Sequence, residues 1–439
     1  MRLLALFICM LIAETNIAAD LSGSLSFKQS GANRWQLHYC FNSPIKEFQF
    51  SRSMTGNMHA DYWDFPSDEF DFKQEEDGTH TLSRADNKPF RCFDLHVKTY
   101  TKLPEKNYLA FSEFTDGGVS VFTGYYQGVA RTEEADNWQE TKLSVAYIPL
   151  EGNSVYKLPD TELGEQFVYF GPSKADEIPS GKLVVDTAIP KEVRDDLVLG
   201  IKSVNEYLQS LFSAEETPEY LIFIAGGELL TTDGISIKGG ARPDQLLFTF
   251  KGTGTLGIIE KEPRWLPTFI AHEVSHLWQH KIWEKLGEDQ PWVHEGGAEN
   301  LARAVLKQSG IFTPDEYSEE MGRLERRCVR NLNKSSVYAG GETGNSKVFY
   351  NCGNVVYDTV AQTLNPKDRA DGALTFWQAL AAHPAEKRNA SESEKLVFET
   401  FKELGLSDTA LEAIRAFLQE KHDDPEAAIE TMKQAVLRG

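Results

Sequence analysis

His272-Glu273-Val274-Ser275-His276 is the stretch on which the interpretation of this 439-residue chain depends, because it has the pattern H-E-x-x-H. Residues four apart share one face of a helix, so both imidazoles can bind one Zn²⁺ ion at about 2.0–2.1 Å. Glu273 then lies close enough to act on a water molecule beside the metal. No Pro or Gly interrupts residues 268–286. The stretch predicts a zinc-binding helix over 267–286, and the alternative is a helix with two core or solvated histidines.

Glu295 is the candidate for a third ligand. Eighteen residues separate it from His276, and it lies in the segment Trp292-Val293-His294-Glu295-Gly296. A catalytic zinc site needs three protein ligands and one open position. A second patterned helix over 295–308 would deliver this carboxylate, although a solvated acid at a helix N-terminus is the alternative. We therefore expect one Zn²⁺ ion held by His272, His276 and Glu295. Glu299, one turn further on, could contact a ligand from behind, but we favour its interpretation as a solvated or capping acid.

Two further motifs accompany the zinc pattern. His276-Leu277-Trp278 reads His-x-Trp, and Tyr350-Asn351-Cys352-Gly353 reads Tyr-x-x-Gly. In combination, these motifs resemble the gluzincin metallopeptidases, above all the aminopeptidase N and leukotriene A4 hydrolase family, over about residues 220–380. The resemblance implies a thermolysin-like α/β catalytic domain and a peptide or protein substrate. It also implies Glu273 as the general base and Tyr350 as the donor to the oxyanion, the alternative for Tyr350 being an ordinary half-buried tyrosine at a helix start.

Two departures from the family pattern leave the substrate open. Gly240-Ala241-Arg242-Pro243-Asp244 stands where the family has Gly-x-Met-Glu-Asn, so no glutamate occupies the position that holds a free amine. His280-Lys281 stands where the family has Gly-Asn or Gly-Asp, which removes a contact to the zinc helix. Three functions remain as hypotheses: an aminopeptidase-like enzyme, an endopeptidase or other zinc hydrolase, and a non-catalytic protein that retains zinc. The presence of the base Glu273 argues against the third.

The rest of the chain predicts an α+β protein with several domains. Residues 20–150 carry alternating and aromatic-rich stretches broken by turn residues, which indicate a β-rich domain. Residues 151–310 mix helical and strand patterns and contain the zinc motif, with strands expected at 220–225 and 245–250 and a glycine-rich connection at 234–240 between them. Residues 311–439 are mainly helical and would complete the active site through Tyr350.

The first nineteen residues have the features of a signal peptide. Arg2 precedes the apolar run 3–12, and the small residues Ala18 and Ala19 follow, so we expect cleavage after Ala19. The run is too short to span a bilayer, and no later stretch is long enough. We therefore expect an exported protein, either periplasmic or extracellular.

Four cysteines remain after that cleavage, which permits three pairings of two disulfides or four free thiols. Locality favours Cys40–Cys92 and Cys328–Cys352. The net charge is −21, which disfavours nucleic acid or an anionic membrane as a partner. The sequence gives no indication of oligomeric state.

Overall fold

The computed structural model describes residues 21–52, 62–75, 78–101, 108–134, 137–159, 162–213, 219–283, 286, 289–388 and 392–438. The expected signal peptide, residues 1–19, lies outside this range. Contacts within the chain define two compact units. The first comprises the residues up to Ala110, Thr123–Leu150 and Pro159–Glu165, and the second comprises Phe111–Phe122, Glu151–Leu158 and the chain from Gln166 onward.

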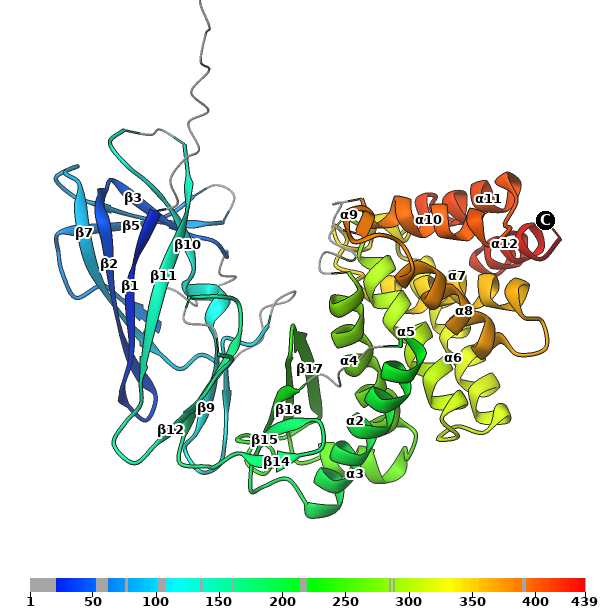
Figure 1. Ribbon diagram of the computed structural model, residues 1–439, viewed down its shortest axis with the longest axis horizontal. Coiled ribbons are helices and arrows are strands. Elements are labelled where there is room, and N and C mark those ends of the chain that lie inside the picture. Colours follow the sequence, from blue (N-terminus) through cyan, green and yellow to red (C-terminus); the bar gives the residue numbers. More distant parts are fainter. Residues whose placement is uncertain are drawn as a thin grey trace, which may run out of the picture. The chain divides into compact units, whose positions relative to one another are not determined.

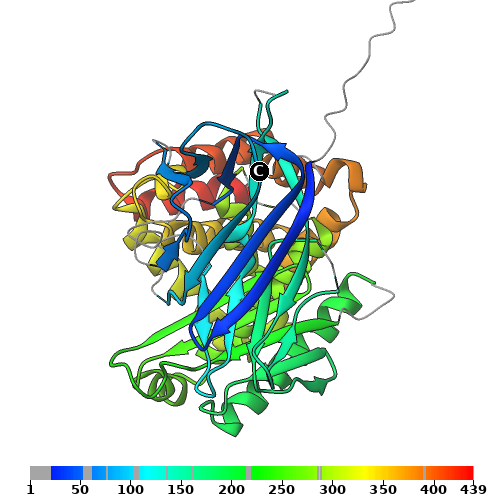
Figure 2. The same cartoon turned by 90° about the vertical axis from the view of Figure 1, so that its left-hand side faces the viewer.

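The first unit is built on one nine-stranded sheet, in the order β4-β7-β2-β1-β11-β10-β3-β6-β5 among the described residues (Figure 1). Alternate residues of β2 are buried, which is the period expected of a strand with one face on a core. β1 pairs with β2 antiparallel and with β11 parallel, and these long strands run side by side (Figure 2). The strands are β1 (Leu21–Gly31), β2 (Arg34–Ile45), β3 (Glu47–Phe50), β4 (Trp63–Asp64), β5 (Phe70–Gln74), β6 (His80–Arg84), β7 (Phe90–Lys98), β10 (Gly128–Arg131) and β11 (Gln139–Ile148).

Aromatic side chains fill the core of this unit. Tyr39 stacks on Phe93 with ring centroids 4.4 Å apart, and Phe48 lies edge-on to Phe50 at 4.9 Å. The disulfide Cys40–Cys92 joins directly paired residues of β2 and β7. The β-rich character expected of this region is confirmed, as is this disulfide.

The second unit contains two smaller sheets. One has the order β12-β13-β9-β8, and the other has the order β14-β15-β16-β18-β17 with β15, β16 and β18 parallel. β16 is buried along its whole length, which explains its continuous apolar sequence. The strands are β8 (Phe111–Glu113), β9 (Val119–Phe122), β12 (Ser154–Tyr156), β13 (Phe167–Gly171), β14 (Asp176–Ile178), β15 (Gly181–Val185), β16 (Tyr220–Ala225), β17 (Ser236–Arg242) and β18 (Gln245–Lys251).

One sequence prediction in this region was wrong. We expected residues 234–240 to form a glycine-rich connection, but Ser236–Arg242 is the strand β17, which pairs antiparallel with β18 along seven residues. Gly239 allows a close approach to a helix, whereas Gly234, before the strand, takes a positive φ of 100°. A Cβ on Gly239 would lie 2.0 Å from Oε1 of Glu273, so only glycine lets the strand lie this near the zinc-motif helix.

Buried polar groups join the two sheets of the second unit. The side-chain amide of Gln245 on β18 makes two hydrogen bonds of 2.7 Å with the backbone of Phe167 on β13. The buried carboxylate of Asp186 accepts hydrogen bonds from the backbone N–H groups of Thr115 (2.7 Å), Ala188 (2.9 Å) and Gly226 (3.1 Å). Because unpaired buried polar groups are costly, these contacts fix how the sheets pack.

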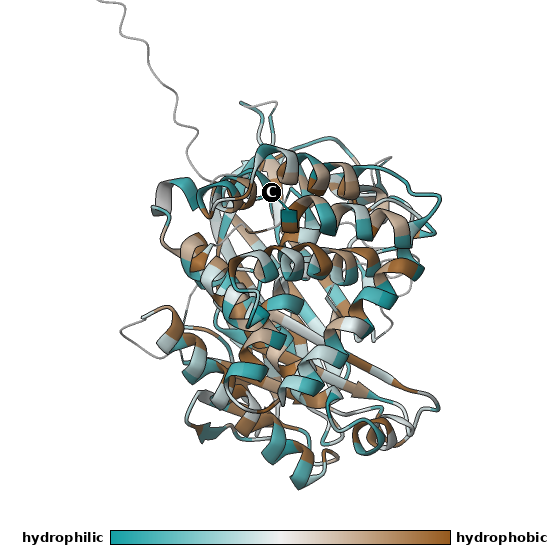
Figure 3. Ribbon diagram, turned by 90° about the vertical axis from the view of Figure 1, so that its right-hand side faces the viewer, coloured by the Kyte–Doolittle hydropathy of each residue, from teal (hydrophilic) through white to brown (hydrophobic). Residues whose placement is uncertain are grey.

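Helices make up the rest of the second unit. Figure 3 shows helices that carry both hydrophilic and hydrophobic residues, as expected of helices with one buried face. None of the described helices has a stretch long and apolar enough to cross a membrane. The helices are α2 (Lys191–Leu211), α3 (Thr255–Lys261), α4 (Trp265–Ile282), α5 (Pro291–Gln308), α6 (Pro314–Leu332), α7 (Lys347–Leu364), α8 (Arg369–Ala381), α9 (Ala385–Arg388), α10 (Ser393–Glu403), α11 (Asp408–Gln419) and α12 (Pro425–Arg438), with a 3₁₀ turn at Tyr338–Gly340. A further 3₁₀ turn, Thr123–Tyr126, belongs to the first unit.

Three of these helices carry the candidate site. α4 packs against α5 and β17, and α5 packs against α7. The disulfide Cys328–Cys352 joins α6 to α7, with a Cα–Cα distance of 4.8 Å, as expected from locality. The α+β architecture, with a β-rich start and a helical end, is therefore the one predicted.

Candidate metal centre

α4 is a buried helix, and its burial fixes the two histidines. Thirteen of its residues are buried, including the whole stretch from Ile270 to Gln279. Trp278 anchors the helix, because its indole N–H donates to Oδ1 of the buried Asn205 on α2 at 2.8 Å. His272 and His276 are 8% and 5% exposed, so their rings are held inside the protein. The helix ends at Ile282, four residues before the expected end, because Trp283 takes an extended conformation.

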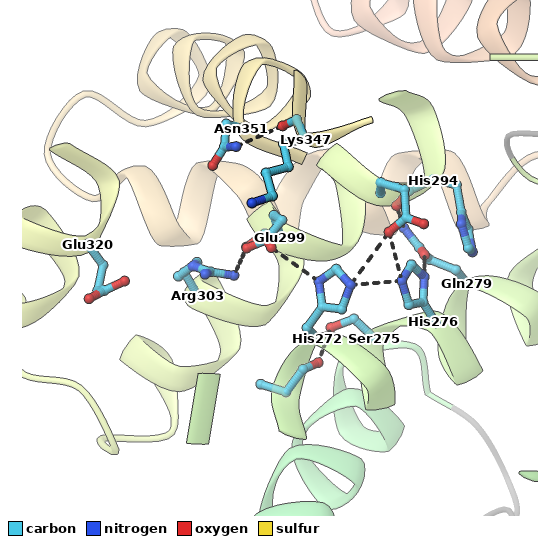
Figure 4. A network of polar contacts seen from close by, with 12 residues as sticks. His272, Ser275, His276, Gln279, His294, Glu299, Arg303, Glu320, Lys347 and Asn351 are labelled. Carbon is cyan, nitrogen blue, oxygen red and sulfur yellow. Dashed lines mark hydrogen bonds and ion pairs between the residues drawn. The ribbon is translucent and has the colours of Figure 1, made fainter. Parts of the chain in front are cut away.

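The side chains of His272, His276 and Glu295 converge on one point. Nε2 of His272 and Nε2 of His276 are 3.0 Å apart (Figure 4). Oε2 of Glu295 lies 3.6 Å from Nε2 of His272 and 3.3 Å from Nε2 of His276. Ligands about 2.05 Å from a tetrahedral zinc ion are separated by about 3.3 Å. The triangle therefore has the size that a zinc ion requires, and its two nitrogens and one oxygen are donors that zinc prefers.

A hydrogen bond fixes the orientation of the second histidine. Nδ1 of His276 lies 2.8 Å from Oε1 of Gln279, whose side-chain amide donates in turn to the backbone carbonyl of His294 at 3.0 Å. Since the amide oxygen accepts only, Nδ1 carries the proton, and Nε2 presents its lone pair to the triangle. Gln279 thus orients His276 from the same helix. It directly precedes His280-Lys281, the pair that departs from the family pattern.

Glu273 lies on the same helix and is surrounded by protein. It is 7% exposed, and it lies against the backbone of Gly239 on β17. Burial raises the pKa of Glu273 to about 7, the nearby His276 opposes this shift, and Glu295 adds to it. A carboxyl group with such a pKa is suited to accept and return a proton near neutral pH.

Tyr350 lies in the first turn of α7 and faces the zinc helix. Its ring stacks on the imidazole of His272 with centroids 5.8 Å apart. Desolvation, and then the charge of Glu295, raise the pKa of the Tyr350 hydroxyl well above its ordinary value. The phenol therefore stays protonated and can donate a hydrogen bond beside the triangle.

Sequence reasoning did not single out Gly239, Gln279 or His294. His294 stacks on His276 at 4.0 Å, and burial lowers its pKa well below the ordinary value, so it is a neutral ring beside the ligand. Helical spacing from His276 could have indicated Gln279, three residues later. Nothing in the sequence marks Gly239, because its proximity to Glu273 arises only from packing. Glu299, interpreted as a solvated or capping acid, is instead largely buried, with 14% of its side chain exposed, and is ion-paired with Arg303.

Comparison with known proteins shows the fold. No family model and no curated protein sequence matches the chain. Among solved structures, an M1 zinc metallopeptidase of Deinococcus radiodurans bound to a Tyr-Ser-Ala substrate is similar with a TM-score of 0.52 and 10% identity, over 92% of this chain and 94% of that one. Leukotriene A4 hydrolase of Saccharomyces cerevisiae is similar with a TM-score of 0.54 and 12% identity, over 93% and 68%. The fold that the motifs led us to expect is thus confirmed.

Proposed function

We propose that this chain is a zinc-dependent peptidase in which His272, His276 and Glu295 hold one Zn²⁺ ion. The triangle of two imidazole nitrogens and one carboxylate oxygen carries the proposal, because it has zinc's preferred donors at the right separations. The similar M1 fold supports it. When bound, zinc would polarise the scissile carbonyl group and lower the pKa of a water molecule.

The chain's own residues would then move the protons. Glu273 would take a proton from the attacking water on its carboxylate and pass it to the leaving nitrogen of the peptide. Its burial supports this role. Burying a carboxylate costs free energy, and groups of this kind are found mainly at functional sites. Tyr350 would donate its hydroxyl proton to the carbonyl oxygen as negative charge develops there, and losing one such donor typically costs about 10²–10³ in rate.

The finer assignment is an aminopeptidase-like enzyme, on the strength of the fold and of the motifs at His276-Leu277-Trp278 and Tyr350-Asn351-Cys352-Gly353. One observation favours the alternative, an endopeptidase. β17 carries no acidic side chain from Ser236 to Arg242. The next acid along the chain, Asp244, sits in the hairpin turn and belongs to the far end of the strand, about 10 Å or more beyond Gly239.

A matched peptide panel tests the function and separates these alternatives. Peptides of the same sequence with free and N-acetylated ends are incubated with the zinc-loaded protein, with and without a chelator. Cleavage confined to free amines supports an aminopeptidase, and cleavage of blocked peptides supports an endopeptidase. If the chelator leaves hydrolysis unchanged, the proposed dependence on zinc is wrong. If nothing is cleaved, the proposed peptidase is wrong and a non-catalytic zinc protein becomes the better description.

We also propose that the protein is exported, to the periplasm or the extracellular medium. The signal-peptide pattern of residues 1–19 supports this, and so do the two disulfides, which persist mainly in oxidising compartments. N-terminal sequencing of the native protein tests the proposal. A mature chain that begins at Asp20 is the expected result, and a chain that retains Met1 would contradict it.

A further inference from the structure

A histidine, a carboxylate and a disulfide lie together on the sheet of the first unit. β2 and β7 are neighbours in this sheet (Figure 1), and their register pairs His38 with Asp94 and Cys40 with Cys92. Residues two apart in a strand share a face, and the aromatic residues between them are buried, so these four side chains lie on the face away from the aromatic core. Cys92 is exposed and Cys40 half-buried, and the side chains of His38 and Asp94 are 52% and 54% exposed.

Contacts between these side chains lead from the carboxylate to a sulfur atom. Nδ1 of His38 lies 2.7 Å from Oδ1 of Asp94, and Nε2 of the same ring lies 3.1 Å from Sγ of Cys40. A carboxylate only accepts hydrogen bonds, so Nδ1 donates its proton to Asp94 and Nε2 faces the sulfur. Carboxylate, imidazole and sulfur in this order form the arrangement by which a histidine activates a cysteine.

This arrangement favours the reduced form of Cys40. A disulfide sulfur is a weak acceptor, whereas a thiolate carries a negative charge that an imidazolium N–H stabilises. The Asp94 carboxylate stabilises the imidazolium in turn and holds the ring in place. Because a stabilised thiolate is also a better leaving group, the bond between Cys40 and Cys92 should break readily when a thiol attacks it.

The second disulfide, Cys328–Cys352, has a different environment. Both of its cysteines are 0% exposed, so an external thiol does not reach either sulfur while the protein is folded. Exposed disulfides tend to be labile and regulatory, whereas structural disulfides resist reduction. The chain therefore contains one disulfide of each kind, which provides an internal comparison.

We propose that Cys40–Cys92 is a redox-active disulfide that a dithiol reduces while the protein stays folded. His38 stabilises the thiolate of Cys40, and Asp94 is a positioning residue that orients His38. The inference is independent of the proposed peptidase, whose residues lie in the second unit. The competing explanation is that Cys40–Cys92 serves stability alone and that the nearby histidine has no effect on it.

The exchange takes two steps. A thiolate of the dithiol attacks Sγ of Cys92, the more exposed sulfur, and forms a mixed disulfide with it, while the bond to Cys40 breaks and Cys40 leaves with the electron pair. The second thiolate of the dithiol then attacks the first sulfur of the dithiol, which closes a disulfide in that molecule and releases Cys92. Of the two protons that the dithiol loses, one goes to Cys92 and the other to Nε2 of His38. The dithiol is thus oxidised by two electrons, and the protein disulfide is reduced by two.

The rate of reduction by dithiothreitol at pH 7, without denaturant, tests the proposal on the full mature chain. Samples are alkylated at intervals, and mass spectrometry of the cysteine peptides follows each disulfide, while circular dichroism follows the fold. We expect Cys40–Cys92 to be reduced while Cys328–Cys352 stays intact, and His38→Ala to slow the first reaction about tenfold. His96→Ala is the matched control. It removes another histidine of β7 that faces a carboxylate, with Nδ1 3.9 Å from Oδ2 of Asp64, and it should leave the rate unchanged.

A second measurement separates the effect of His38 from the effect of exposure. Cys92→Ser leaves Cys40 as a free thiol, and Cys40→Ser leaves Cys92. Although Cys40 is the less exposed of the two, iodoacetamide at pH 7 should alkylate it about tenfold faster, because the thiolate is the nucleophile and His38 stabilises it. Adding His38→Ala should remove this advantage.

Three results would overturn the inference. The first is a Cys40–Cys92 bond that stays oxidised while the fold is intact, and the second is reduction of both disulfides together as the fold is lost. The third is a His38→Ala variant whose disulfide is reduced within about twofold of the wild-type rate. If His38→Ala does not fold, Asp94→Asn keeps the test valid, because it removes the charge behind the ring and should slow the reduction in the same direction.

Discussion

Replacement of Gly239 by alanine should displace the general base without touching a metal ligand. The new Cβ would lie 2.0 Å from Oε1, 2.2 Å from Cδ and 2.6 Å from Cγ of Glu273, whereas ordinary contacts begin at 3.4 Å. The carboxylate must therefore shift by about 1.4 Å, unless β17 gives up its pairing with β18. A misplacement of about 1 Å can cost 10²-fold in rate, so we expect kcat to fall about 100-fold, which corresponds to ~2.7 kcal/mol in the activation free energy.

The assay for this variant is kcat on a cleaved peptide at measured zinc content. Zinc content should stay at the wild-type level, since all three ligands lie on α4 and α5. Gly257→Ala on α3 is the matched control, because nothing lies within 4 Å of its new Cβ, and this variant should keep full activity. If folded, zinc-replete Gly239→Ala has wild-type kcat, the argument that β17 confines Glu273 is refuted.

Three further predictions concern the supports of the site. Asp186→Ala leaves the buried N–H of Gly226, and the less buried N–H groups of Thr115 and Ala188, without their acceptor, so urea denaturation should show a loss of about 1–3 kcal/mol; an unchanged unfolding free energy would contradict this. Gln279→Leu removes the acceptor for His276, so chelator competition should show zinc binding weakened about 10–100-fold, and unchanged affinity would show that this contact does not matter. Replacing Cys328 and Cys352 together by serine should cost about 2–4 kcal/mol of unfolding free energy by denaturant titration, and intact-protein mass after non-reducing alkylation should find neither thiol free in the wild type.

Much of the fold could be predicted, because local sequence patterns indicate the individual strands and helices. The strand 220–225 was predicted with the bounds that the structure shows, since a short apolar run lies between polar segments. The end of the zinc helix was misplaced, because Trp283 and Leu286 continue the apolar pattern, yet Trp283 leaves the helix and is buried in an extended conformation. Periodicity cannot distinguish these two ways of burying an apolar side chain.

The candidate metal ligands could be identified from their spacing in the sequence, whereas the residues that pack against the site could not. His272, His276 and Glu295 follow from helix geometry and an interval of eighteen residues. By contrast, the role of Gly239 depends on β17 lying against α4, which brings Gly239 to Glu273, a residue 34 positions later in the sequence. Glu299 was expected to meet water. Its spacing of four residues from Arg303 indicates an ion pair on a helix, but the burial of that pair depends on packing, which the sequence does not show.

The rate of peptide hydrolysis by zinc-loaded Glu273→Gln, relative to the wild type at equal zinc content, tests the central claim most directly. Glutamine nearly matches glutamate in shape, so the metal triangle should persist, but its amide cannot accept a proton from water. We expect zinc to remain bound and the rate to fall by about 10²–10⁴, the usual contribution of a general base. A zinc-replete variant that hydrolyses peptides at the wild-type rate would contradict the proposed role of this buried carboxylate, and with it the mechanism.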